Sequence, residues 1–398
     1  MDKEKTAHTI DKCLEYLLYL LVFFIPISNA AIEIIFMLTL VLFLIKKFLK
    51  PDFHFLHDRG CIFLALFLIF SAFSLVNSGI YLNKAVKALI CKWLEYIGIL
   101  IIVTDTIGSP RRLRNALVIS LAVCGLVAAD AIFQGVTGVD FLRFKGLSKW
   151  DWRVTASFKS GNGLAAYLVP HLILIVTLLF FRPMKKQFKF FLFFLAAIAT
   201  CAIVLTGSRG AWLSFLAALA LTAALSKKFK AISVVILVFL VIIVLVPVLR
   251  ERMISVFLPG QDASRRVLNS ISWQMISENP FLGKGVGTYM NHFKSYASAE
   301  LGIQYAHNTF LQIWAECGIF ALLSFILFLE AVLFRGARLY KIKNNPVILA
   351  LVCAASGFLI HSAFETQLYS LQLAAFFWFF MGMAMAANRL ELKAFVMR

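Results

Sequence analysis

Charged residues are scarce in this sequence. Only 15% of the 398 residues are Asp, Glu, Lys or Arg, whereas 61% are hydrophobic, and the mean hydropathy is +0.87. A soluble domain usually has about 25% charged and about 45–50% apolar residues. The composition therefore leaves too little polar surface for soluble domains, and it excludes disordered and fibrous chains as well. The remaining class is a polytopic helical membrane protein.

Paired cysteines and clustered metal ligands are also missing. The seven cysteines form no C-x-x-C pair and nearly all lie in apolar segments, which predicts buried small apolar side chains rather than a disulfide framework. The sequence has no Asp-x-Asp pair and no cluster of His, Cys and Asp residues. It therefore predicts neither a metal site nor a cofactor.

Long apolar runs dominate what is present. Runs of about 17–25 apolar residues span a bilayer as helices, and continuous rather than alternating runs argue against β-strands. The mixed charges of Met1–Lys12 make a poor signal peptide, so the first run is retained as a span. The sequence predicts an all-α polytopic membrane protein with about 12 transmembrane helices, near 13–28, 30–45, 61–76, 88–104, 115–133, 161–181, 190–206, 211–226, 231–249, 307–334, 346–362 and 370–387.

Basic residues outnumber acidic ones, 39 to 20. If the N-terminus is cytoplasmic, short loops and tails on that side contain 24 of the 39 basic residues. Cytoplasmic loops are normally enriched in Lys and Arg, so both termini are predicted to be cytoplasmic. The other 15 basic residues lie mainly in two longer outer segments, 134–160 and 250–306, where they could contact anionic lipid headgroups or bind a phosphate-bearing substrate.

The chain is predicted to form a single integral membrane domain. Residues 1–249 carry spans one to nine, 250–306 form one large outer loop with short helices, and 307–398 carry the last three spans. Within the loop, Ser264 could cap an amphipathic helix that ends before Asn279-Pro280 and either lies on the membrane or roofs a cavity. Its apolar stripe would be Val267, Leu268, Ile271, Met275 and Ile276.

Arg209 is the first candidate site residue. It follows Thr206-Gly207-Ser208 in a short break between two apolar runs. The next helix would begin near Ser208, so its unpaired N–H groups and positive dipole end would lie close to the guanidinium, a combination that binds phosphate. The alternative is a tight hairpin in which Arg209 reaches the lipid phosphates.

His307 is the second candidate. It opens a long apolar run directly after the large loop, and an imidazole at a helix N-terminus is kept neutral by the dipole and suits a general base. The alternative is an interfacial histidine bonded to the loop. Glu316 lies about two and a half turns deeper and about 180° around the helix, so it should not orient His307 directly and needs an internal partner. Other acidic residues in or near spans are Glu33, Glu95, Asp130, Glu330 and Glu365.

Four motifs together resemble the O-antigen ligase/polymerase superfamily of membrane glycosyltransferases. They are Thr206-Gly207-Ser208-Arg209-Gly210-Ala211-Trp212, the basic loop helix with Arg265, the stretch from Asn279-Pro280 to Gly287-Thr288-Tyr289, and His307-Asn308 followed by Leu311, Glu316 and Gly318. A weaker match is Phe158-x-x-x-Asn162-x-Leu164-Ala165. The clear resemblance covers about 160–320.

The resemblance implies an O-antigen ligase of the bacterial inner membrane with its active site on the periplasmic face. Such an enzyme transfers a glycan from undecaprenyl diphosphate to a sugar hydroxyl of lipid A–core, without a metal, and by inversion if the transfer is a single displacement. Arg209 and Arg265 match arginines thought to hold the diphosphate, and His307 matches an essential histidine. The family usually has an aromatic residue four positions after the loop arginine, whereas this chain has Asn269, so Arg266 is the alternative to Arg265.

Other functions stay open at this point. A polymerase of the same superfamily would use a lipid-linked glycan as acceptor. A lipid-glycan transporter should show repeated halves or charges paired near the midplane, and neither is evident in the sequence. The expected partners are the lipid-linked O-antigen, lipid A–core and membrane lipids. Nucleic acid is not expected, because the basic residues are scattered among apolar runs rather than gathered on a soluble module.

Overall fold

The structure is a computed structural model that describes residues 3–53, 58–147, 152–254, 263–297 and 304–396. Regular structure in these ranges is helical, apart from one isolated β-bridge between Val139 and Gly146. The longer elements are α1 (Lys3–Phe24), α2 (Asn29–Leu49), α3 (Arg59–Phe73), α4 (Leu82–Ala88), the π-helical turn η4 (Leu89–Leu94), α5 (Glu95–Thr106), α6 (Pro110–Thr137), α7 (Gly161–Phe181), α8 (Lys186–Leu205), α9 (Arg209–Ser226), α10 (Phe229–Leu245), α11 (Pro247–Ile254), α12 (Ala263–Glu278), α13 (Tyr289–His292), α14 (Thr309–Lys343), α15 (Pro346–Ser362) and α16 (Leu371–Val396). Short 3₁₀ turns are η2 (Ser74–Asn77), η3 (Gly79–Tyr81), η6 (Phe293–Ser295) and η7 (Gln367–Tyr369).

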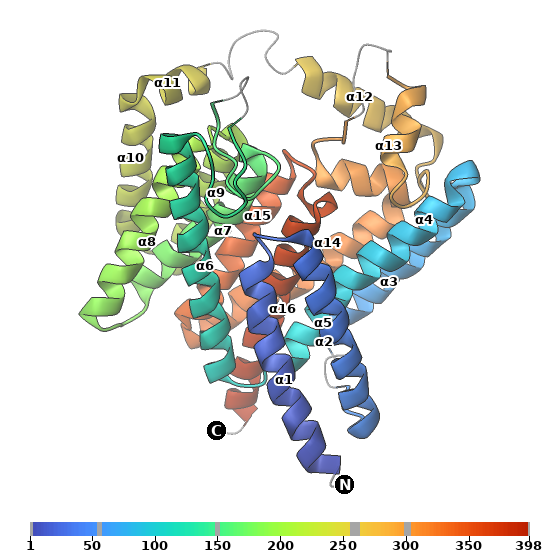
Figure 1. Cartoon of the computed structure of the whole chain (residues 1–398), viewed down its shortest axis with the longest axis horizontal. Coiled ribbons are helices and arrows are strands. Elements are labelled where there is room, and N and C mark those ends of the chain that lie inside the picture. The colour runs from blue at the N-terminus through green and yellow to red at the C-terminus, as the bar shows by residue number, and fades with distance from the viewer. Residues whose placement is uncertain (1–2, 54–57, 148–151, 255–262, 298–303, 397–398) are drawn as a thin grey trace.

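The helices form one antiparallel bundle (Figure 1). Neighbouring pairs include α14 with α3, α15 with α7 and α9, and α16 with α5. The start of α1 and the end of α16 lie at the same end of the bundle, which we name the terminal face. The opposite end carries α11, α12 and α13, and we name it the loop face. The polar connections therefore divide between two ends, as expected for a chain that crosses a membrane repeatedly.

The all-α polytopic class is confirmed. In the described part of the chain seven helices are long and apolar enough to cross a membrane, and α10 and α15 are shorter apolar helices of the same kind. The seven are α3 with its 3₁₀ extension, α6, α7, α8, α9, α14 and α16. The other predicted spans correspond to α1, α2 and the α4–α5 stretch. The count of twelve spans stays a prediction.

Helix ends follow capping residues. The predicted spans 161–181 and 346–362 coincide with α7 and α15. The Ser160 hydroxyl accepts a hydrogen bond from the Gly163 N–H, and Asn345 caps α15 just before a proline at the first helical position. In contrast, α1 begins at Lys3, well before the predicted residue 13, because its charged first turns bind neighbouring helices instead of ending the helix.

Two helices form the core of the bundle. In the apolar windows of α16 and α7, 94% and 83% of residues are buried, against 28% for α3 and α8, whose apolar side chains face outward. In a membrane such outward apolar faces contact lipid. The prediction that the cysteines are buried is wrong for Cys13, Cys91 and Cys201, which are exposed on the bundle surface; all seven cysteines are free.

The predicted span at 307–334 is a broken helix. α14 is interrupted at Gly318, whose φ of 81° and ψ of 174° leave neighbouring backbone groups without helical partners. The loop after α12 supplies those partners: the N–H groups of Lys284 and Gly285 donate to the carbonyls of Ala315 and Glu316, and the Ile319 N–H donates to the Pro280 carbonyl. The Asn279-to-Gly287 motif is thus the partner of the break in α14.

The amphipathic helix in the large loop exists as α12, and it roofs the bundle. It begins at Ala263, so Ser264 lies inside the helix and is not its cap. Val267 is 41% exposed, which corrects its place in the apolar stripe. The other four stripe residues are buried and pack with Tyr289, Phe293 and Ala315.

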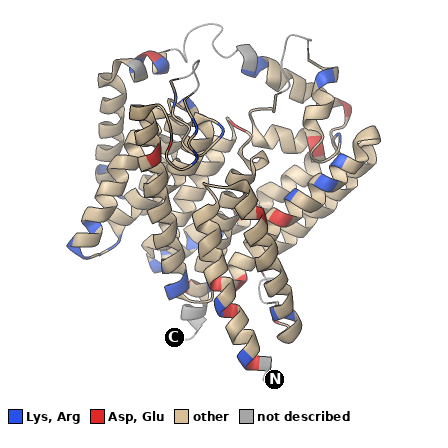
Figure 2. Cartoon of the chain, viewed as in Figure 1, with Lys and Arg blue, Asp and Glu red and all other residues tan. Residues whose placement is uncertain are grey.

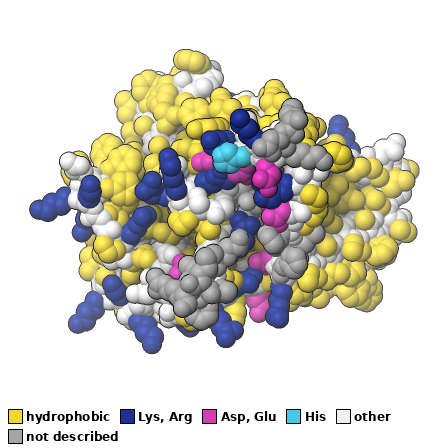
Figure 3. Space-filling model, turned by 90° about the horizontal axis from the view of Figure 1, so that it is seen from below, with side chains coloured by type: hydrophobic (Ala, Val, Ile, Leu, Met, Phe, Trp, Pro, Cys, Tyr) yellow, Lys and Arg dark blue, Asp and Glu magenta, His cyan; other side chains and the backbone are white. Residues whose placement is uncertain are grey.

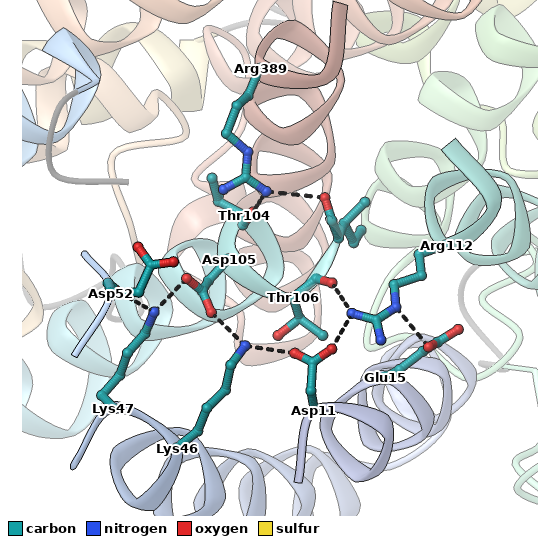
Figure 4. A network of polar contacts seen from close by, with 11 residues as sticks. Asp11, Glu15, Lys46, Lys47, Asp52, Thr104, Asp105, Thr106, Arg112 and Arg389 are labelled. Carbon is teal, nitrogen blue, oxygen red and sulfur yellow. Dashed lines mark hydrogen bonds and ion pairs between the residues drawn. The ribbon is translucent and has the colours of Figure 1, made fainter. Parts of the chain in front are cut away.

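Charged side chains join five helices at the terminal face (Figures 2, 3 and 4). Lys46 Nζ lies 2.6 Å from Asp11 Oδ1 and 2.9 Å from Asp105 Oδ2, and Lys47 Nζ lies 2.6 Å from Asp105 Oδ1. Arg112 binds Asp11 at 2.6 Å and Glu15 at 2.8 Å. Arg389 donates to the Thr104 carbonyl at 2.6 Å. The side chains of this network come from α1, α2, α5, α6 and α16, so it locks the helix ends together (Figure 4).

Candidate active site

Three interhelical segments, those before α7, before α9 and after α15, meet at the loop face. The Arg153 guanidinium donates to the Thr206 carbonyl at 2.6 Å and also to the Asn162 side chain. A Cβ added at Gly210 would lie 3.4 Å from the Cβ of Phe364. The segments before α7, before α9 and after α15 therefore lie against one another, although they are far apart in sequence.

Glu365 is the hub of this region. Its Oε2 lies 2.8 Å from Nδ1 of His307, and its Oε1 accepts hydrogen bonds from Arg265 Nη2 at 3.1 Å and from the Asn162 amide. The Glu365 backbone carbonyl accepts a further bond from Thr309 Oγ1 at 2.8 Å. One carboxylate, only 13% exposed, thus joins the first turn of α7, α12, and the segment that leads into α14.

The backbone and partner of His307 fix its ring. Asn308 is the N-cap of α14 and accepts from the Phe310 and Leu311 N–H groups, so His307 lies just before the helix rather than inside it. Its φ of +48° is in the left-handed region, an uncommon conformation that is retained where surrounding contacts require it. An ionised carboxylate can only accept, so His307 donates from Nδ1, and the neutral form of the ring then has its lone pair on Nε2. This is the tautomer that a base acting through Nε2 requires.

A cavity of about 480 Å³ lies beside His307, and we name it the histidine cavity. Its lining includes His307, Glu365 and Asn162, together with the aromatic side chains of Tyr305 and Tyr369. The two tyrosine rings lie 5.8 Å apart. Aromatic faces and hydrogen-bonding groups around one cavity are the usual means of holding a polar organic ligand.

Of the two candidate arginines on α12, one lies at the histidine cavity and the other faces outward. Arg265 reaches the histidine cavity through its ion pair with Glu365. Arg266 is exposed and has no ion pair within the described ranges, so the geometry brings Arg265 rather than Arg266 to His307.

Arg209 is the first residue of α9, with Ser208 as N-cap, as predicted. Arg252 flanks the same turn, donating to the Gly207 carbonyl at 2.6 Å with its guanidinium over the Trp152 ring.

Glu316 has the internal partners that its depth requires. It is 1% exposed, and its carboxylate accepts from the backbone N–H groups of Gly287 and Tyr289 and from the Tyr369 hydroxyl at 3.0 Å. It does not contact His307, in agreement with the prediction from helical spacing. Glu316 therefore fastens the Gly-rich loop and the wall of the histidine cavity to α14.

The electrostatics of the hub keep Glu365 ionised. Burial by itself raises the pKa of this carboxyl, but the hydrogen bond and charge of His307 and the charge of Arg265 outweigh burial and lower the pKa below its usual value of 4.5. His361, one turn earlier, is completely buried, and neither ring nitrogen has a hydrogen-bond partner among the described residues. Its ring contacts the start of α9, since a Cβ at Gly210 would lie 3.3 Å from it.

Sequence reasoning did not assign Glu365, Asn162 or Arg153 to the site. Glu365 is 58 residues from His307 and 100 from Arg265, so no local spacing connects them. The only sequence signal for Glu365 was its position at the end of an apolar run, where an ionisable residue normally has a function. Within the described ranges no group of three or more His, Cys, Asp or Glu side chains could hold a metal ion.

Fold and site together define a class: an integral membrane protein with a histidine-containing cavity, lined by polar and aromatic side chains, at one end of its helix bundle. Residues 191–326 match the family model described as O-antigen ligase. This match confirms the resemblance and supports the assignment of the chain to the O-antigen ligase superfamily. It includes Arg209, Arg265 and His307 but ends before Glu365. No curated protein matches the chain.

Proposed function

We propose that the protein is an O-antigen ligase. In this proposal it transfers a glycan from undecaprenyl diphosphate to a sugar hydroxyl of lipid A–core, at the periplasmic face of the bacterial inner membrane, with both termini in the cytoplasm. The observation that carries the proposal is the His307–Glu365–Arg265 arrangement beside the histidine cavity, within the segment that matches the family.

The geometry supports a single displacement. The acceptor oxygen forms a bond to the anomeric carbon while the bond from that carbon to the diphosphate oxygen breaks. The hydroxyl proton passes to Nε2 of His307, and the electron pair of the broken bond leaves with undecaprenyl diphosphate. Glu365 stabilises the imidazolium that results, because its carboxylate already binds Nδ1–H. Attack opposite the leaving group inverts the anomeric centre.

The leaving diphosphate needs positive charge. Arg265 and Arg209 are the proposed ligands, assisted by the N-terminal N–H groups of α9. Donors fixed before the reaction stabilise the charge that develops as the bond breaks, and each is worth several kcal/mol of barrier, on the order of 3 kcal/mol. This role explains why arginines gather around the Gly207 turn.

The test uses purified full-length protein with lipid-linked O-antigen and lipid A–core, without ATP. Glycan on the core is the expected product of the wild type, whereas longer lipid-linked chains would indicate a polymerase. His307→Ala should lower the transfer rate by roughly 10²–10⁴-fold, the usual contribution of a general base. Arg209→Ala and Arg265→Ala should each lower it by roughly 10²-fold.

Arg266→Ala is the matched control, since Arg266 is the neighbouring exposed arginine on α12. It should transfer glycan at close to the wild-type rate. If His307→Ala and Arg209→Ala both retained full transfer at wild-type membrane levels, the proposed mechanism would be wrong.

A further inference from the structure

A second polar cavity lies apart from the proposed catalytic residues. It has a volume of about 320 Å³, and we name it the lysine cavity. Three lysines line it, Lys84, Lys87 and Lys92, all from α4 and the π turn, together with the carboxylates of Glu33 and Glu95. The mechanism proposed above uses none of these residues. Figure 2 shows basic positions along α4 in the arm that extends below α13.

The π turn aligns the lysines. In a regular α-helix, residues eight positions apart are about 80° out of register. A π turn takes up about one extra residue, so Lys84 and Lys92 are spaced as if seven apart, within about 20° of two full turns. Both lysines line the same cavity as a result. A π turn is rare, and such turns are frequently found at functional sites.

The lysines present free positive charge. Lys84 Nζ binds the Asn291 side chain at 2.6 Å, and this bond joins α4 to the roof of the loop face. Lys87 and Lys92 are exposed, and within the described ranges neither forms a hydrogen bond or ion pair, even with the two carboxylates of the cavity. The cavity has three ammonium groups and two carboxylates, so its net charge favours an anionic ligand. Hydroxyl groups on the same ligand could donate hydrogen bonds to the two carboxylates.

The lysine cavity and the histidine cavity each share lining residues with a third cavity. A cavity of about 160 Å³, which we name the connecting cavity, shares Lys84 and Lys92 with the lysine cavity. It shares Met290, Tyr305 and Tyr369 with the histidine cavity. Glycine at position 287 is required where the loop crosses this path, because a Cβ there would lie 2.3 Å from that of Ala88. Neighbouring cavities with shared walls thus lie in a row from the lysines past the two tyrosines to the cavity that His307 lines.

The elements that carry the charged residues of the lysine cavity also expose apolar side chains. Ile34 of α2 and Ile90 and Leu94 of the π turn are 62%, 53% and 46% exposed on the elements that carry Glu33 and the lysines. Such side chains face lipid in a membrane protein. A ligand of this cavity can therefore keep its acyl chains in the bilayer while its charged head enters among the lysines.

We propose that the lysine cavity binds a phosphate group of the acceptor glycolipid, whose sugar extends through the connecting cavity to His307. This inference rests on the proposed function. It assigns the donor diphosphate to the arginines on one side of the histidine cavity and the acceptor phosphate to the lysines reached from the other side. Separate sites for the two substrates are what a direct transfer between two membrane lipids requires.

The test measures binding of lipid A–core to the full-length protein in phosphatidylcholine nanodiscs. Two probes are used, the phosphorylated glycolipid and the same molecule after enzymatic removal of its phosphates. The double variant Lys87→Gln/Lys92→Gln keeps side-chain length and removes charge. It should bind the phosphorylated probe roughly tenfold more weakly than the wild type, about the effect of one charge-assisted contact. The dephosphorylated probe should bind both proteins equally.

Lys294→Gln is the control, because Lys294 is an exposed lysine of the loop face that does not line the cavity. It should bind both probes like the wild type. Equal binding of the phosphorylated probe by the wild type and the double variant would overturn the proposal. So would an equal loss of both probes.

Ordinary anionic phospholipid offers the same phosphate chemistry, so one arm replaces part of the phosphatidylcholine with phosphatidylglycerol. If this replacement weakened the wild type to the level of the double variant, the cavity would be a headgroup site and the proposal would be wrong. His307→Ala is assayed for glycan transfer, which should fall by roughly 10²–10⁴-fold. Retained transfer in that variant would count against the proposed function, whereas retained binding in the lysine variant counts against this inference alone.

Discussion

At the scale of single residues, the candidate site depends on one carboxylate. Glu365 binds His307, Arg265 and Asn162, so it sets both the tautomer of the proposed base and the position of a proposed diphosphate ligand. The sequence alone placed His307, Arg209 and Arg265 as site residues because local motifs contain them. It could not place Glu365, since only the tertiary fold brings the end of α15 to the start of α14.

Glu365→Gln should lower kcat by roughly 10²-fold or more, because the neutral amide neither selects the Nδ1–H tautomer nor stabilises the imidazolium. The pKa of Glu365 is lowered, so its carboxylate is charged, and its contribution fully present, at all pH values above 4.5. That contribution is lost only as the pH falls through the lowered value. Ionisation of Glu365 itself should therefore add no inflection to the wild-type kcat profile between pH 5 and pH 9, and the variant should be slower than the wild type when each is compared at its own pH optimum.

The measurement is a pH profile of kcat for both proteins at saturating donor and acceptor. A variant kcat equal to the wild-type kcat at the optimum of each profile would contradict the role assigned to Glu365. Glu330→Gln is a suitable control, because Glu330 is an acidic residue of α14 that takes no part in the site.

At the scale of elements, hydropathy predicted where helices lie but not where they break. Continuous apolar runs between capping residues gave the bounds of α7 and α15. The π turn within 88–104 and the kink at Gly318 were not predicted, because both change backbone hydrogen bonding and leave the apolar pattern intact. Gly318 is part of the motif that begins at His307-Asn308. The structure explains why this position is glycine, because its backbone conformation and its contact with Phe281 leave no room for a side chain.

Gly318→Ala should therefore destabilise the loop face severely. The added Cβ would lie 2.0 Å from the Phe281 carbonyl oxygen, and the φ and ψ values of Gly318 lie in a region that is essentially restricted to glycine. Strain and displacement of the loop together should cost at least about 3 kcal/mol. The measurement is the thermal midpoint of the detergent-purified protein, with its yield in membranes.

Gly108→Ala provides the comparison. A Cβ at Gly108 would meet nothing closer than a backbone oxygen at 3.9 Å. Its thermal midpoint should stay within a degree or two of the wild type, the small effect usual for substitutions without a clash. A Gly318→Ala protein as stable as Gly108→Ala would show that the contact between the loop and the kink does not support the fold.

At the scale of the whole molecule, the net charge of +19 has two structural consequences. Basic residues in short loops predict the orientation of the chain, which stays a prediction, and the structure has both ends of the chain at the terminal face (Figure 1). Several of the same residues also stabilise the bundle. Lys46, Lys47 and Arg112 bind acidic side chains on other helices, a role that composition and loop counting could not reveal.

The ion-pair network at the terminal face predicts that losing a buried pair destabilises the protein more than losing an exposed pair. Asp105, 9% exposed, is held by Lys46 and Lys47, which are 15% and 6% exposed. Asp105→Asn removes the carboxylate that lies 2.6 Å from Lys47 Nζ and 2.9 Å from Lys46 Nζ, and removal of one member of a buried ion pair costs about 3–5 kcal/mol. The thermal midpoint of the purified protein should fall by several degrees.

Asp58→Asn is the matched substitution at the same face. Asp58 pairs with Arg335 at 2.6 Å, but Arg335 is 40% exposed, and Asn can still cap α3 as Asp58 does. An exposed pair contributes about 0–1 kcal/mol, so this variant should melt close to the wild type. Equal losses in the two variants would show that burial does not set the strength of the network. A loss confined to Asp105→Asn would mean that the buried basic residues of the terminal face hold its helices together.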